Sequence, residues 1–236
     1  MTTEYKLRKL VNPTKEELDA AARIAAEAFH DDFNRACLGG NWDLLFPFWR
    51  GVVGAQQIGG ENVVAVTDDG KFVGLAGWYP PGRMFLETPD QAEDGYSAFV
   101  SKLPAEQMEW FMQYFMPKYS EVTTQAFGEG TKKDVWNLQT LCVLPEYQRR
   151  GIGRSLVKDK EDQIIAEKSG QAITLESEVE KNVSSTFVVR LSTLLIFTMQ
   201  TELYKKWGFE VKGKSHFESK HGDFDMWCLY KKLPSS

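Results

Sequence analysis

Residues 148–154, Gln-Arg-Arg-Gly-Ile-Gly-Arg, bring arginines and glycines together between an apolar, strand-like run and a helical pattern. Glycine lets the backbone come close to a ligand, and the first N–H groups of a helix have no partner inside the helix and attract anions. Arginine adds a fork of donors that matches a phosphate group. The segment therefore predicts a site for a diphosphate. The alternative is an ordinary strand-to-helix turn without a ligand.

The same segment resembles motif A of the GNAT superfamily of N-acetyltransferases, Q/R-x-x-G-x-G/A, because Gln148, Gly151 and Gly153 stand at its fixed positions. The stretch LYKKWGF at 203–209 is similar to the family's L-Y-x-x-x-G-F element. The resemblance covers nearly the whole chain and is specific mainly over 136–176 and 203–209. It implies a fungal-type small-molecule enzyme of the acyltransferase class.

Such an enzyme transfers an acetyl group from acetyl-CoA to a primary amine by direct attack, without a metal. Two other interpretations stay open, a non-catalytic CoA-binding module and an acetyltransferase of protein lysines or N-termini. Fold resemblance does not choose the acceptor, because acceptor loops vary on a constant scaffold.

The resemblance also implies which residues hold acetyl-CoA. Backbone groups of Leu141, Cys142 and Val143 pair with the pantetheine arm in the manner of strand addition. The cradle for the pyrophosphate consists of Gln148, Arg149, Arg150, Gly151, Ile152, Gly153 and Arg154. Cys142 is expected to be a small buried hydrophobic residue rather than a nucleophile, since no histidine is near it in sequence.

Tyr204 matches the tyrosine that acts as general acid in the family, and a phenol can give its proton to a leaving thiolate. The alternative is a tyrosine that only packs its helix against the sheet. The general base is predicted to be Glu176, at the end of a strand. Glu178, Asp134 and a chain of water molecules are alternatives for that role.

The surrounding pattern predicts an α/β protein, and its order of elements resembles that of the GNAT fold. Seven strands are expected at 5–11, 61–67, 71–79, 135–143, 171–176, 210–217 and 225–231. Helices are expected from Thr14, where Glu17 completes a capping box, and over about 44–57, 104–116 and 151–168, the last ended by Gly170. In this fold a mixed sheet of about seven strands is flanked by helices, and two splayed parallel strands hold the cofactor.

Residues 82–133 are the least regular part of a single domain that spans 1–236, and the variable acceptor side is expected there. One helical face carries Met108, Phe111, Met112 and Phe115. Such a stripe is mostly core, but part of it, or the neighbouring Trp110 or Tyr114, is also suited to touch a substrate.

Composition limits the ligands and the cellular compartment that are expected for this protein. A net charge of −5 disfavours a general nucleic-acid surface. Three widely separated cysteines indicate a reducing compartment, and no signal peptide or membrane span is evident, so a cytoplasmic protein is expected. It is expected to be a monomer or a homodimer. The histidines and cysteines lack the spacing of a metal site.

Residues 183–200 depart from the family pattern. The family places the L-Y-x-x-x-G-F element soon after the preceding strand, whereas VSSTFVVRLSTLLIFTMQ intervenes here. Its first and last residues can be encoded by splice-site sequences, which leads to the hypothesis of a retained intron. The competing hypothesis is a genuine apolar insertion.

Overall fold

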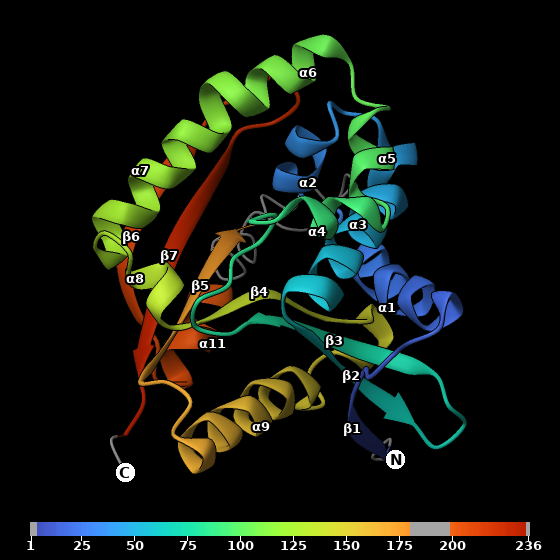
Figure 1. Ribbon diagram of the computed structural model, residues 1–236, viewed down its shortest axis with the longest axis vertical. Helices are drawn as coiled ribbons and strands as arrows, with labels where there is room; N and C mark the ends of the chain where they lie inside the picture. The colour runs from blue at the N-terminus through green and yellow to red at the C-terminus, as the bar shows by residue number, and fades with distance from the viewer. Residues whose placement is uncertain (1–3, 180–198, 235–236) are drawn as a thin grey trace, which may run out of the picture.

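A mixed seven-stranded sheet forms the middle of the described part of the chain, residues 4–179 and 199–234 of a computed structural model. The strands are β1 (Tyr5–Lys9), β2 (Glu61–Thr67), β3 (Phe72–Tyr79), β4 (Trp136–Val143), β5 (Ala172–Val179), β6 (Glu210–Phe217) and β7 (Phe224–Lys232). Their order across the sheet is β1-β2-β3-β4-β5-β7-β6, and among these strands only the neighbours β4 and β5 are parallel (Figure 1). The predicted α/β architecture is confirmed.

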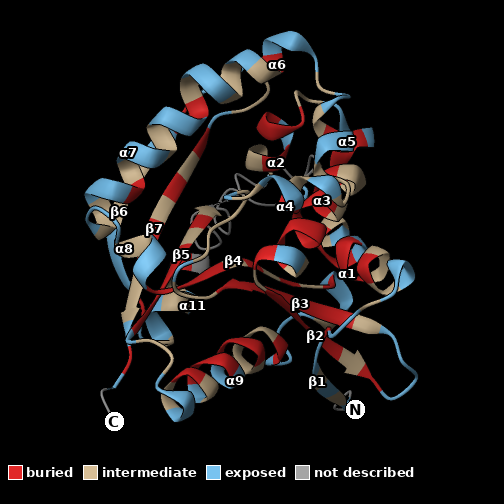
Figure 2. Cartoon of the chain, in the orientation of Figure 1, coloured by how far each residue is buried: buried red, intermediate tan, exposed pale blue. Residues whose placement is uncertain are grey.

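Helices cover both faces of this sheet. They are α1 (Lys15–Ala28), α2 (Asp32–Cys37), α3 (Leu45–Gly59), α4 (Pro89–Glu93), α5 (Tyr96–Val100), α6 (Ala105–Trp110), α7 (Met116–Phe127), α8 (Thr131–Asp134), α9 (Ile152–Glu167) and α11 (Met199–Lys206). Short turns of other helix types are η1 (Trp42–Leu44), the π-helix η2 (Phe111–Phe115) and η3 (Pro145–Tyr147). Helices α1 and α3 pack on one face of the sheet and α9 on the other, each with its buried side inward (Figure 2).

Local sequence signals explain where several elements begin. Thr14 is the N-cap of α1, and it exchanges the two predicted capping-box hydrogen bonds with Glu17. Small and apolar residues at helical spacing, among them Leu18, Ala21 and Ala25, are buried against the sheet. The predicted N-terminal helix is therefore confirmed.

The parallel pair β4–β5 is short, and this opens the sheet. Only Trp136, Asn137 and Leu138 of β4 pair with β5. The register between β3 and β4 shifts at the next residue, which leaves Gln139 as the extra residue of a bulge. A bulge bends its strand, so β4 and β5 diverge from this point and their facing edges lie apart.

The helical run from α6 to α7 is longer than predicted. The sequence favours an end at Met116, because Pro117 lacks the N–H that a helix interior needs. In the structure the helix continues to Phe127, since the wider π-turn of η2 bonds the N–H of Met116 to the carbonyl of Phe111. Pro117 then falls in the first turn of α7, where its missing N–H is tolerated.

Two further expectations are wrong, and a third concerns residues that the structure does not describe. Lys168, with φ of 51°, ends α9 in place of Gly170. The sequence predicts no helix between the one that begins at Thr14 and the one over about 44–57, but α2 lies there. The insertion and the retained-intron hypothesis concern residues 183–200, of which 183–198 lie outside the described residues; α11 begins at Met199. None of the described helices has the length and apolar character needed to cross a lipid bilayer.

Candidate active site

The turn between β4 and α9 has the geometry of an anion cradle. It contains two residues with positive φ, Arg149 at 59° and Gly151 at 84°. Gly151 is the N-cap of α9, and no described side chain caps this helix start. The Nε2 amide of Gln148 donates to the Val143 carbonyl at 3.1 Å and ties the turn to the end of β4. The first N–H groups of α9 are therefore oriented toward a potential anion.

Gly153, in the first turn of α9, has room in front of it. A Cβ atom at this position would lie 3.8 Å from its nearest neighbours, Trp207 and Val143, which is an ordinary contact distance. Neither internal packing nor a positive φ therefore requires glycine here. The same open space lets a diphosphate approach this backbone, so the cradle fits the pyrophosphate of acetyl-CoA.

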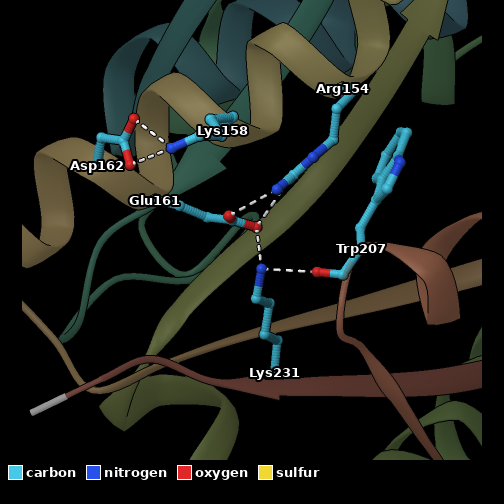
Figure 3. Close-up of polar contacts among 6 residues, drawn as sticks. All are labelled: Arg154, Lys158, Glu161, Asp162, Trp207 and Lys231. Carbon is cyan, nitrogen blue, oxygen red and sulfur yellow. Dashed lines mark hydrogen bonds and ion pairs between the residues drawn. The ribbon is translucent and has the colours of Figure 1, made fainter.

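Arg154 is already engaged by the protein (Figure 3). Its guanidinium donates to both carboxylate oxygens of Glu161, at 3.2 and 3.3 Å, and lies over the ring of Trp207. Glu161 also accepts from Lys231 at 2.6 Å, and Lys231 donates to the Trp207 carbonyl at 2.7 Å. This cluster fastens α9 to β7 and to the turn after α11, so much of the Arg154 charge is balanced before any ligand arrives.

A cavity of about 1100 Å³ joins the cradle to the gap between β4 and β5. Every residue predicted to hold acetyl-CoA lines it except Arg150. Arg150 instead donates to the Glu146 carbonyl at 2.7 Å and lies over the ring of Tyr147. Both predicted catalytic residues, Tyr204 and Glu176, also line the cavity.

The wall provided by β4 presents an extended backbone to the cavity. Leu141, Cys142 and Val143 pair with β3 on one side, and β5 has already diverged on the other. A ligand with amide groups can add to this edge as a strand would. Burial raises the pKa of the Cys142 thiol, which keeps it neutral and makes it a weak nucleophile.

Tyr204 reaches the cavity from α11. Its ring packs edge-on against Trp207 and Phe209, with centroid distances of 5.4 and 5.7 Å. Burial, together with the nearby Glu178 and Cys142, raises the pKa of the phenol. A general acid must hold its proton at neutral pH, and this environment ensures that Tyr204 does.

The two glutamates at the end of β5 have different surroundings. Glu176 forms an ion pair with Lys132 at 2.9 Å, and both side chains are largely buried. Lys132 also donates to the hydroxyl of Tyr119 and lies over its ring. The charge of Glu176 is therefore balanced within the protein, and its role as a base stays a prediction.

Glu178 lies two residues further along β5 and also lines the cavity. Burial, with repulsion from Asp31 and Glu176, raises its pKa to about 8, although a backbone hydrogen bond and Lys132 oppose the shift. A carboxylate whose pKa is near the working pH can both accept and release a proton, as a general base must. The third alternative, Asp134, is exposed and does not line the cavity.

Asp31, the N-cap of α2, faces the same cavity. Its Oδ1 accepts from the backbone N–H and the Nδ2 amide of Asn34, both at 2.7 Å, and burial raises its pKa. Sequence reasoning missed both Asp31 and Lys132. For Asp31 a signal existed, since Asp followed by a short helical stretch is an N-cap pattern. For Lys132 no local signal existed, because its partner is far away in sequence.

The far wall of the cavity comes from the stripe on α6 and η2. All four of its predicted residues, Met108, Phe111, Met112 and Phe115, line the cavity. Trp110 does not: it turns away, and its indole N–H donates to the Glu218 carbonyl at 2.9 Å. Phe115 is buried in a second core cluster as well, so the stripe serves both packing and the cavity wall.

Part of the chain matches a known protein family. Residues 120–211 match the family model for the Acetyltransferase (GNAT) domain, a range that contains the cradle, Glu176, Glu178 and Tyr204. A search of the curated proteins found no match.

Solved structures of acetyltransferases share the fold over nearly the whole chain. Arylalkylamine N-acetyltransferase 2 from Aedes aegypti is 11% identical, with a TM-score of 0.57 over 97% of this chain and 100% of that one. Histone acetyltransferase HPA2 and related acetyltransferase from Corynebacterium glutamicum is 17% identical, with a TM-score of 0.55 over 98% and 97%. The ribosomal-protein-S18-alanine N-acetyltransferase from Escherichia coli is 15% identical, with a TM-score of 0.51 over 99% and 96%. The chain therefore has the GNAT acetyltransferase fold, and these neighbours act on different acceptors.

Proposed function

We propose that this chain is an N-acetyltransferase that moves the acetyl group of acetyl-CoA to the primary amine of a small molecule. One observation carries the proposal. A single cavity joins a glycine cradle at the start of α9, a stretch of β4 that has diverged from β5, a protonated tyrosine and a carboxylate with raised pKa. The GNAT match over 120–211 supports the same reaction.

The chain's own groups have distinct roles in this proposal. Acetyl-CoA, when bound, supplies the acetyl group. Glu178 takes the proton of the amine, whose nitrogen forms the new bond to the carbonyl carbon as the carbon–sulfur bond breaks. Tyr204 donates its proton to the departing sulfur and regains one from solvent, so the products are the amide and the free thiol. Glu176, held in an ion pair by Lys132, lies two residues before the base on β5.

The proposal also covers the organisation and setting of the chain. Residues 1–236 act as one domain, with 82–133 on the acceptor side, because that region supplies part of the cavity wall. The three cysteines are buried and unpaired, which supports a reducing compartment such as the cytoplasm.

The first test is a thermal-shift titration of the purified chain with acetyl-CoA. Saturation at about a hundredfold excess over Kd raises stability by about 2.7 kcal/mol. Release of free thiol on addition of amines then measures transfer directly. A folded protein with no shift at millimolar acetyl-CoA contradicts the proposal, and a shift without transfer to any amine identifies a CoA-binding module instead.

Replacement of Tyr204 by Phe tests the proposed acid. It removes one oxygen atom from the cavity wall, so kcat is expected to fall by about 100-fold or more while the acetyl-CoA thermal shift is unchanged. Tyr230→Phe is the matched control, because Tyr230 lies on β7 and does not line the cavity. Equal kcat in the Tyr204→Phe variant and the wild type excludes Tyr204 as the acid.

A further inference from the structure

The acceptor end of the cavity has an apolar wall. Phe33 on α2 and Phe85 in the loop after β3 line it, together with Phe111 and Met112 of the η2 π-turn. Met112 is 62% exposed although it is a large apolar side chain. Aromatic and methionine side chains present adaptable apolar surface, which favours a ligand body with few polar groups.

Two acids line the same cavity from different elements. Asp31 comes from the start of α2 and Glu178 from the end of β5, and repulsion from Asp31 contributes to the raised pKa of Glu178. Both hydrogen bonds from Asn34 go to Oδ1 of Asp31, so within the described residues Oδ2 has no donor. Lys132, the cation that partly offsets this repulsion at Glu178, is already paired with Glu176.

We infer that the acceptor is a primary amine on a compact aromatic or similarly apolar body, with the amine beside Asp31 and Glu178 and the body against Phe111 and Met112. A cation between the two carboxylates relieves their repulsion, while an apolar body removes the exposed surface of Met112 from water. Asp31 holds the amine through Oδ2, and Glu178 accepts its proton. This inference rests on the proposed acetyl transfer but makes separate claims about binding.

The first experiment compares three amines in the thiol-release assay. 2-Phenylethylamine, ethylamine and 1,4-diaminobutane share a primary amine and differ in the apolar ring or the second charge. Burial of the ring predicts a kcat/KM between about 10- and 100-fold higher for phenylethylamine than for ethylamine. Met112→Ser is expected to reduce this preference about fivefold, and Gln113→Ser, an exposed neighbour that does not line the cavity, leaves it unchanged.

The second experiment measures binding without turnover. Calorimetric titrations compare phenylethylamine with 2-phenylethanol, its neutral counterpart. The wild type is expected to bind the amine at least about 10-fold more tightly, and Asp31→Asn, which retains an N-cap, removes the difference. The helix α2 is thereby preserved while the charge is lost.

The outcomes separate the two proposals. Transfer to diaminobutane or ethylamine as efficiently as to phenylethylamine overturns the inference and leaves acetyl transfer standing. Charge-dependent binding of phenylethylamine without transfer of any amine supports the inference and removes the proposed function. Equal binding of amine and alcohol by the wild type overturns the role of Asp31.

Discussion

Replacement of Glu178 by Gln is expected to remove activity and stabilise the fold at the same time. The carboxyl is partly buried in the cavity that Asp31 also lines, and its pKa in the folded protein is about 8 against an ordinary value of 4.5. Glutamine keeps the size and the hydrogen-bonding capacity of the side chain and cannot ionise. The loss of a general base predicts a fall in kcat of about 100-fold or more at pH 8.

The gain in stability follows from the sign of the pKa shift. Between pH 4.5 and about 8 the unfolded chain has lost the Glu178 proton and the folded chain retains it. The free energy of unfolding therefore decreases as pH rises through this window, by about 1.4 kcal/mol for each pH unit, and levels off above it. The Gln variant lacks this loss, so at pH 7 it is expected to be more stable by about 3 kcal/mol.

The assay is thermal unfolding of both proteins from pH 4 to pH 9. A difference of about 3 kcal/mol corresponds to roughly 6–12 °C in Tm for a chain of this size, and the two curves are expected to converge near pH 4. Glu176→Gln is the matched control on the same face of β5. It leaves Lys132 buried without its ion partner, so it is expected to lower stability by about 1–3 kcal/mol. A Glu178→Gln variant whose Tm difference is independent of pH refutes the high pKa and the role assigned to this residue.

Two further predictions concern helix α9. Gly153→Leu is expected to abolish the acetyl-CoA thermal shift, since its side chain takes up space in the cavity that Gly153 lines; a full shift in a folded variant shows that the cradle does not hold the diphosphate. Glu161→Gln is expected to lower the free energy of unfolding by about 2–4 kcal/mol in urea, because two cations lose a buried partner. Asp162→Asn breaks only the exposed ion pair with Lys158, so it is expected to lower the free energy of unfolding by less than about 1 kcal/mol. Equal effects of the two variants contradict the conclusion that Glu161 stabilises the fold by binding both Arg154 and Lys231.

Elements with local signals were predictable from the sequence. The capping box at Thr14 and Glu17 marks the start of α1 within the sequence itself. The Asp68-Asp69-Gly70 turn between two apolar runs fixes the β2–β3 hairpin, and the two strands match the predicted ranges within a residue. The strand, basic turn and helix around Gly151 were likewise predictable, because the motif and its context occupy one continuous stretch.

Features that depend on packing between distant segments were not predictable. Helix α2 has only six residues, too few for a helical period to show, and the N-cap pattern of Asp31 does not reveal that this side chain lines the cavity. The difference between Glu176 and Glu178 arises because Lys132 from α8 reaches the first and Asp31 approaches the second. The two glutamates are equivalent in sequence, and position at a strand end carries no information for choosing between them.

The bulge at Gln139 leaves β4 with an edge that β5 does not cover and that lines the cavity. An exposed edge recruits other chains and leads to aggregation, whereas this one meets only molecules narrow enough to enter the cavity. Backbone amides of β4 beyond Leu138 that point to β3 should exchange with deuterated water slowly, and the alternate amides rapidly. The protein thus keeps backbone hydrogen-bonding groups of β4 available in its interior, without the risk of aggregation that such an edge carries on a surface.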